Sequence, residues 1–131
     1  MLNILNLDKV SSIFILSGAG IDAESGIKTF RASDGLWEGH DVTSVAHPDG
    51  FAKDRDLVYS FYNERRKQLL SPSTKPNAAH YALADLEKHY QVDIVTQNIS
   101  DLQQRAGSTS IIQMHGSLIE ARCLSENNHV L

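Results

Sequence analysis

Three short runs of apolar residues are separated along the chain by glycine-containing, polar or helically periodic stretches. The runs lie at 13–16, 92–96 and 110–114. Their length and their bulky or β-branched residues predict strands, and the first run is continuous enough to predict burial on both faces. The intervening segments 54–70, which ends before Pro72, and 77–89, which Asn77 caps, are predicted helices. This alternation predicts an α/β fold with a parallel, layered sheet.

The helical segment 54–70 places one charged residue on its apolar stripe. The stripe consists of Val58, Tyr62, Arg65 and Leu69. A buried guanidinium needs a partner, so Arg65 either pairs with a core acid or binds a ligand. Tyr62 and Arg65 are three residues apart and can reach one point. A phenol beside a guanidinium makes a suitable carboxylate clamp.

The remaining segments predict less regular structure. Residues 38–46 are polar and are predicted to be irregular, whereas 47–51 has turn chemistry that can open a short helix. A short helical turn to Arg105 ends at Ala106 and Gly107, and 118–123 is compatible with a further extended piece. The buried face of the second helix is predicted to carry Ala79, Leu83, Leu86 and Tyr90.

The first strand runs directly into glycines. Gly18, Ala19 and Gly20 follow it, and Gly26 lies further on. Glycines after a buried strand let the backbone approach a ligand closely and leave N–H groups free to bind a phosphate. The pattern alone is weak, because short glycine patterns are common in loops.

The next segment, 28–37, is too polar and glycine-broken to be the long helix of a standard dinucleotide-binding unit. It contains Phe30, Arg31 and Trp37. An aromatic and an arginine beside a phosphate cradle suit a lid over the far half of a nucleotide. The alternative is a surface loop that Phe30 and Trp37 pin into the core.

Length and composition exclude several classes of protein. The chain has 131 residues, of which 41% are hydrophobic and 21% are charged, as in one ordinary globular domain. Sixteen acidic and twelve basic residues give a net charge of −4, which argues against a nucleic-acid surface. No apolar run has membrane-spanning length. The single cysteine, Cys123, permits no internal disulfide and is compatible with the cytoplasm.

Each predicted strand ends in polar residues. The glycine loop follows the first, Gln97 to Asp101 follow the second, and His115 with Gly116 follows the third. Parallel strands place these three clusters at one edge of the sheet, where open α/β folds bind ligands. The sequence therefore predicts a ligand site at this edge.

Three motifs, in order and spacing, resemble the signatures of the sirtuins, which are NAD-dependent protein lysine deacylases. They are GAGIDAESGIKTFR at 18–31, TQNISDLQQRAG at 96–107, and His115-Gly116. With Tyr62 and Arg65, the segment 28–31 is similar to the bacterial and mitochondrial subclass that accepts acidic acyl groups such as succinyl. The resemblance covers nearly the whole of 1–131 and implies a partial Rossmann-like parallel sheet with flanking helices, in a single NAD-binding region.

The resemblance implies roles for particular residues. Backbone N–H groups of Gly18, Ala19 and Gly20 would hold the pyrophosphate of NAD, and Phe30 would shield the nicotinamide end. His115 would be the general base that deprotonates the ribose, for which imidazole has a suitable pKa; the alternative is a histidine that only caps a strand end. The implied NAD-binding set is Gly18, Ala19, Gly20, Ile21, Asp22, Thr29, Phe30, Arg31, Trp37, Gln97, Asn98, Ile99 and Ser100.

Two positions depart from the usual family pattern. A small hydroxyl residue is usual where Asp22 stands, and an aspartate that receives the nicotinamide carboxamide is usual where Ser100 stands. A carboxylate near a pyrophosphate is expected to repel it. Asp101 lies one position further on and is expected to point elsewhere.

The resemblance also implies a fold that continues well beyond residue 131. Cys123 matches the first zinc ligand of the family, but a structural zinc needs four N or S ligands, and His129 would add only one. The chain thus resembles the amino-terminal half of a deacylase, truncated before the zinc module is complete. Core left uncovered by the absent half would invite self-association or a partner.

Two functions follow. The first is NAD-dependent removal of acetyl, succinyl or malonyl groups from protein lysines, giving nicotinamide and O-acyl-ADP-ribose. The second is a catalytically inactive remnant that binds NAD or ADP-ribose weakly or not at all. A small phosphate-binding α/β domain unrelated to sirtuins would require the three motifs to coincide by chance.

Overall fold

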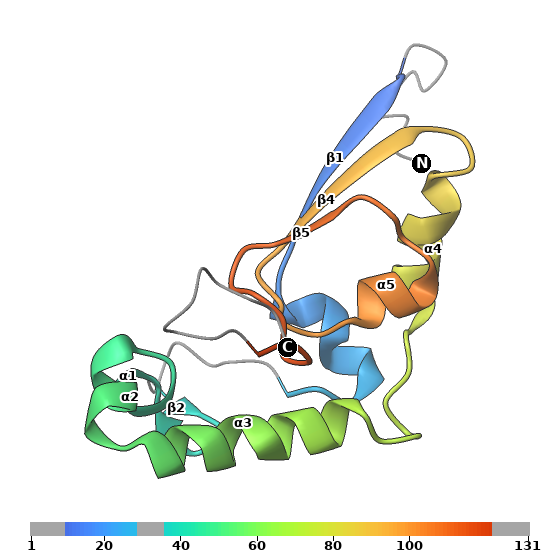
Figure 1. Ribbon diagram of the computed structural model, residues 1–131. Coiled ribbons are helices and arrows are strands. Elements are labelled where there is room, and N and C mark those ends of the chain that lie inside the picture. Colours follow the sequence, from blue (N-terminus) through green and yellow to red (C-terminus); the bar gives the residue numbers. More distant parts are fainter. Residues whose placement is uncertain (1–9, 29–35, 122–131) are drawn as a thin grey trace.

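A computed structural model gives the fold and describes residues 10–28 and 36–121. Three strands form a parallel sheet in the spatial order β1-β4-β5 (Figure 1). They are β1 (Ser12–Ser17), β4 (Gln91–Thr96) and β5 (Ile111–Gln113). Ile15 pairs with Ile94, which in turn pairs with Ile111. The predicted strands and their parallel arrangement are therefore confirmed.

The two faces of this sheet differ in burial. One face carries Val92 and Ile94, which are 3% and 1% exposed. The opposite face carries Phe14, Leu16 and Ile112, which are 70%, 63% and 63% exposed. Burial of the first strand on both faces is thus wrong for the described part of the chain, because no described element covers this second face. The expectation of uncovered apolar core is confirmed.

Two helices, α4 (Ala78–Leu86) and α5 (Leu102–Ala106), lie together beside the strands (Figure 1). The Asn77 side chain caps α4, as predicted, and the helix ends three residues before His89. The predicted buried face is partly wrong. Ala79 is exposed, whereas its neighbour His80 is 0% exposed because it packs into the polar site described below.

The predicted helix 54–70 is α3 (Arg55–Leu69), and the Asp54 side chain accepts a hydrogen bond from the Leu57 N–H at its start. Val58 and Leu69 are buried, and Tyr62 and Arg65 are half-buried, so the predicted stripe is confirmed. The turn at 47–51 opens α2 (Pro48–Lys53). No helix within the described ranges is long and apolar enough to cross a membrane.

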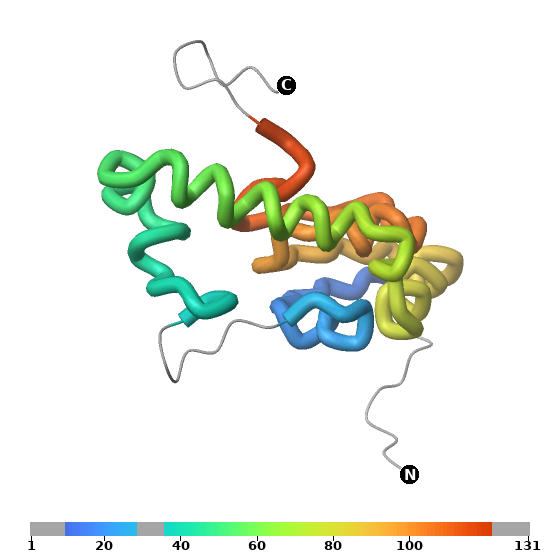
Figure 2. The backbone as a smooth tube through the Cα atoms, turned by 90° about the horizontal axis from the view of Figure 1, so that it is seen from below, coloured from blue at the N-terminus to red at the C-terminus, as the bar shows by residue number. Residues whose placement is uncertain are grey.

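Segment 38–46 is more regular than its polarity predicts. A two-stranded antiparallel hairpin joins β2 (Leu36–Trp37) to β3 (His40–Asp41), and α1 (Val42–Val45) follows. Gly39 lies in the turn with φ of 82°, a conformation that favours glycine. These elements are too short to leave a periodic signal. They and α2 lie at the N-terminal end of α3 (Figures 1 and 2).

The C-terminal half of α3 is joined to the sheet region by a small core and by hydrogen bonds to main-chain oxygens. Leu69, Leu102 and Leu118 form the buried cluster. Arg66 Nε donates to the oxygen of Leu118 at 3.0 Å, and Arg105 Nη1 donates to that of Leu69 at 3.3 Å. Residues 118–119 form a turn within this packing, so the described part of 118–123 is not the extended piece expected.

Candidate functional site

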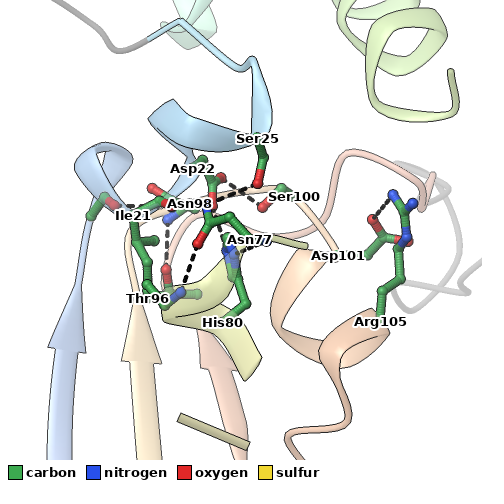
Figure 3. A network of polar contacts seen from close by, with 12 residues as sticks. Ile21, Asp22, Ser25, Asn77, His80, Thr96, Asn98, Ser100, Asp101 and Arg105 are labelled. Carbon is green, nitrogen blue, oxygen red and sulfur yellow. Dashed lines mark hydrogen bonds and ion pairs between the residues drawn. The ribbon is translucent and has the colours of Figure 1, made fainter. Parts of the chain in front are cut away.

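The carboxyl ends of the three parallel strands meet at one edge of the sheet. The Gln97 N–H donates to the oxygen of Ser17 at 3.0 Å, which joins the end of β4 to the end of β1. On the other side, the Met114 N–H donates to the oxygen of Thr96 at 2.9 Å. The predicted convergence of the three polar clusters is confirmed, and Figure 3 shows a network of polar contacts at this edge that includes Asp22, Asn98 and Ser100.

The glycine loop opens a short 3₁₀ helix, η2 (Ala19–Ser25). Gly18 precedes it in an extended conformation, and no side chain caps the helix start. The first internal bond runs from the Ile21 N–H to the Gly18 oxygen at 3.1 Å, so the N–H groups of Ala19 and Gly20 precede the helical ladder. Both residues are exposed, and apart from its chain neighbours and its own helix backbone no described atom lies within 4 Å of a Cβ built at Gly20. This backbone fits an anion such as a pyrophosphate.

Asn98 holds the glycine loop against the end of β4. Its Nδ2 donates to the Gly18 oxygen at 3.0 Å, while its own N–H donates to Thr96 Oγ1 at 3.1 Å (Figure 3). Gln97 is exposed beside the same glycine, with Oε1 3.7 Å from a Cβ built at Gly18. Ile99 packs against the Leu69 cluster, and its contact with NAD stays a prediction.

Asp22 and Ser100, the two positions at which the resemblance implies other residues, lie in contact. Ser100 Oγ donates to Asp22 Oδ2 at 2.8 Å, and both residues are buried. His80 Nε2 lies 3.0 Å from the other oxygen, Oδ1. The carboxylate is thus held by two interior partners and does not lie open to an anion on the loop. The expectation that it repels a pyrophosphate stays a prediction.

Asn77 and His80 belong to the site but were not singled out as site residues from the sequence. Asn77 Nδ2 donates to the oxygen of Ile21 at 2.7 Å and to Ser25 Oγ at 3.0 Å (Figure 3). The available signal was a polar N-cap followed three residues later by a side chain able to return the hydrogen bond. Asp101 points elsewhere, as expected, with Oδ1 3.7 Å from Arg105 Nη1.

His115 lies in the turn after β5 and is exposed. Its side chain makes no hydrogen bond within the described part of the chain, so it does not cap the strand end there. An exposed imidazole at the end of the third strand is available to a ligand at this edge. Its role as a base stays a prediction.

Tyr62 and Arg65 lie on α3, and the structure does not show the buried salt bridge considered for Arg65. The acid within 4 Å of its guanidinium in the described residues is the exposed Glu64, at 3.5 Å. Arg65 Nη1 donates to the oxygen of Phe61 at 3.1 Å, and its guanidinium stacks on the Phe61 ring at 4.3 Å. Arg65 Nε is buried without a hydrogen-bond partner in the described residues. Burial raises the pKa of Tyr62, which therefore stays a hydrogen-bond donor at neutral pH.

Trp37 packs edge-on against Phe61 and Tyr62, with ring centroids 5.0 and 6.1 Å apart. This placement favours packing in the helical region over a lid on a nucleotide. Thr29, Phe30 and Arg31 lie outside the described residues, as does Cys123. Within residues 10–28 and 36–121, no group of three or more His, Cys, Asp or Glu side chains could hold a metal ion. With one cysteine in 131 residues, the chain does not fit a structural zinc site.

Comparison with known proteins identifies the family. The Sir2 family model matches residues 18–130, so the chain belongs to the Sir2 family. It is 57% identical over 122 residues to an NAD-dependent protein deacylase of Vibrio parahaemolyticus, covering 92% of this chain and 50% of that protein. An NAD-dependent protein deacylase of Helicobacter pylori is 56% identical over 121 residues, covering 92% and 52%.

A solved Sir2 homologue in complex with NAD has the same fold over 95% of this chain and 48% of its own, with a TM-score of 0.83 and 40% identity. The chain spans about half the length of these relatives. The sirtuin fold, with its parallel sheet and flanking helices, is thereby shown for this half.

Proposed function

We propose that this chain carries the NAD-binding edge and the general base of an NAD-dependent protein lysine deacylase. The observation that supports this most is the uncapped glycine loop, which Asn98 ties to the end of β4 at 3.0 Å. It is supported further by family membership, by the names of the deacylase relatives and by the NAD complex of a similar structure. Acylated lysine side chains of proteins are the proposed substrates.

In this proposal NAD is a co-substrate whose C1′–nicotinamide bond is broken. The N–H groups of Ala19 and Gly20 bind its pyrophosphate, because they precede the helical ladder of η2. Gln97, exposed beside Gly18, contacts the ribose on the nicotinamide side. His115 accepts a proton from a ribose hydroxyl when the acyl oxygen attacks, and its exposure leaves both ring nitrogens accessible.

A second candidate is a nucleotide-binding remnant without deacylase activity. The observation that favours it is the contact of Asp22 with Ser100 beside the glycine loop, the two positions at which the resemblance implies other residues. Both candidates share NAD binding and differ in whether acyl transfer occurs.

Mass spectrometry of a succinylated peptide incubated with the chain and NAD tests the proposal. O-acyl-ADP-ribose is expected, and His115→Ala should abolish it while leaving NAD binding in place. NAD binding without any acyl transfer would favour the remnant, provided that adding the part of a relative that this chain does not cover also gives no transfer. Absence of both binding and transfer would contradict either form.

The structure also supports a preference for acidic acyl groups. Arg65 has a partly free guanidinium with an unpaired Nε, and the neighbouring Tyr62 keeps its phenol protonated. Arg65→Met should lower turnover of succinyl-lysine by about tenfold or more relative to acetyl-lysine. Lys67→Met, an exposed position on the same helix, is the matched control. Equal losses on both substrates would contradict the clamp.

A further inference from the structure

A buried hydrogen-bonded group of three side chains lies at the nucleotide edge of the sheet. Asp22 is 4% exposed, His80 0% and Ser100 7%. Asp22 comes from η2, His80 from the first turn of α4, and Ser100 from the loop after β4 (Figure 3). Of the acidic residues in the described part of the chain, only Asp22 is buried. A buried carboxylate persists only where donors compensate it.

The hydrogen bonds define the donor and acceptor roles in this group. The Asn77 N–H donates to His80 Nδ1 at 3.2 Å, which leaves the ring proton on Nε2. Nε2–H therefore donates to Asp22 Oδ1 at 3.0 Å, and the Ser100 hydroxyl donates to Oδ2 at 2.8 Å. Each of the two Asp22 side-chain oxygens therefore accepts one hydrogen bond from a buried donor.

Asp22 and Ser100 are also the two positions at which the resemblance to the sirtuins implies the reverse, a hydroxyl at 22 and a carboxylate at 100. Each departure alone is unfavourable, since one adds a carboxylate near the pyrophosphate loop and the other removes a carboxylate. The two side chains are 78 residues apart in sequence but share one hydrogen bond. Taken together, Asp22 and Ser100 still supply one carboxylate and one hydroxyl, joined by one hydrogen bond.

We propose that Asp22 and Ser100 are a reciprocal exchange, in which a carboxylate and a hydroxyl have changed places across one buried hydrogen bond. Asp22 is then a positioning residue that holds η2 to the loop after β4. The Ser100 main-chain oxygen accepts a bond from Gln113 Nε2 at 2.8 Å, so the same residue links the loop to β5. The positioning role of the pair at the nucleotide edge rests on the proposed function, whereas the exchange does not.

A double-mutant cycle tests the exchange on the whole 131-residue chain. The variants are Asp22→Ser, Ser100→Asp and both together. Asp22→Ser leaves His80 Nε2–H and Ser100 without their buried acceptor, and Ser100→Asp sets two carboxylates side by side. Each single change should lower the melting temperature by about 5 to 15 °C, and the double variant should return to within about 2 °C of the unmodified chain.

The chain offers a matched control in a second hydroxyl–carboxylate pair. Ser110 Oγ donates to Asp93 Oδ1 at 2.6 Å, but this bond is exposed. Asp93→Ser, Ser110→Asp and their combination should each shift the melting temperature by no more than about 2 °C, without rescue. Ser100→Asn replaces Ser100→Asp in the cycle where the latter does not fold, and a folded double variant beside an unfolded Ser100→Asp supports the exchange.

Titration with NAD provides the readout that a purely structural role would not give. Each single variant that stays folded at the assay temperature should bind NAD about tenfold more weakly, and the double variant should recover the affinity. A double variant no more stable than the worse single variant overturns the exchange. Rescue of stability without rescue of affinity overturns the positioning role. An unmodified chain that does not bind NAD overturns the proposed function, while the melting cycle still decides the exchange.

Discussion

Two regions of the sheet differ in burial: the edge at the carboxyl ends of the strands, and the open face that carries Phe14, Leu16 and Ile112. At the edge, polar side chains from η2, α4 and the loop after β4 bond one another, and Asp22, His80 and Ser100 are almost completely buried. On the open face, Phe14 and Leu16 are 70% and 63% exposed. Described elements cover these three side chains at the edge, whereas no described element covers the open face. Within the described residues, the polar side chains at the edge are therefore more completely buried than the apolar side chains of the open face.

The largest expected effect compares the two faces directly. Ile94 and Leu16 lie on neighbouring strands but are 1% and 63% exposed. Ile94→Ala should cost about 2 to 5 kcal/mol of unfolding free energy, because it leaves a cavity. Leu16→Ala should cost about 0.5 kcal/mol or less. Urea denaturation followed by circular dichroism measures both, and similar losses would show that the open face is covered in solution.

The next effect concerns the edge. Asn77→Ala removes the cap of α4 together with the bonds to Ile21 and Ser25, and should cost about 1 to 3 kcal/mol. Asn63→Ala is the matched control, because Asn63 accepts one exposed bond from Arg66 and should cost about 0.5 kcal/mol or less. The same denaturation experiment gives both values. Equal losses of unfolding free energy would mean that the hydrogen bonds of Asn77 stabilise the fold no more than one exposed surface bond does.

A smaller effect is expected on association. Replacing Phe14 and Leu16 together by serine should lower self-association in sedimentation velocity, since these side chains supply the exposed apolar surface. Tyr81→Ser is the control, because Tyr81 is 50% exposed but lies on α4. An unmodified chain that is monomeric at high concentration, with a sharp melting transition, would contradict the expectation that the open face promotes self-association.

Much of this edge could be predicted from the sequence, because strand ends and helix caps leave local signals. The glycine loop, Gln97 with Asn98, and the Asn77 cap all lie where their patterns predict. The role of His80 could not be predicted, since a histidine in a first helical turn is buried only through contacts with a segment 58 residues away. The contact of Asp22 with Ser100 is equally non-local. Uncovered apolar surface is predicted, but the face of the first strand that lies open is not, because an apolar run does not show which of its faces is covered.

Calorimetric titration of the 131-residue chain with NAD and with ADP-ribose tests the central claim most directly, namely that the converging strand ends form a nucleotide site. Saturable binding of one nucleotide per chain is predicted, weakened by Asn98→Ala, which releases the glycine loop from β4. A chain that circular dichroism shows to be folded, but that gives no heat with either nucleotide, would contradict the account.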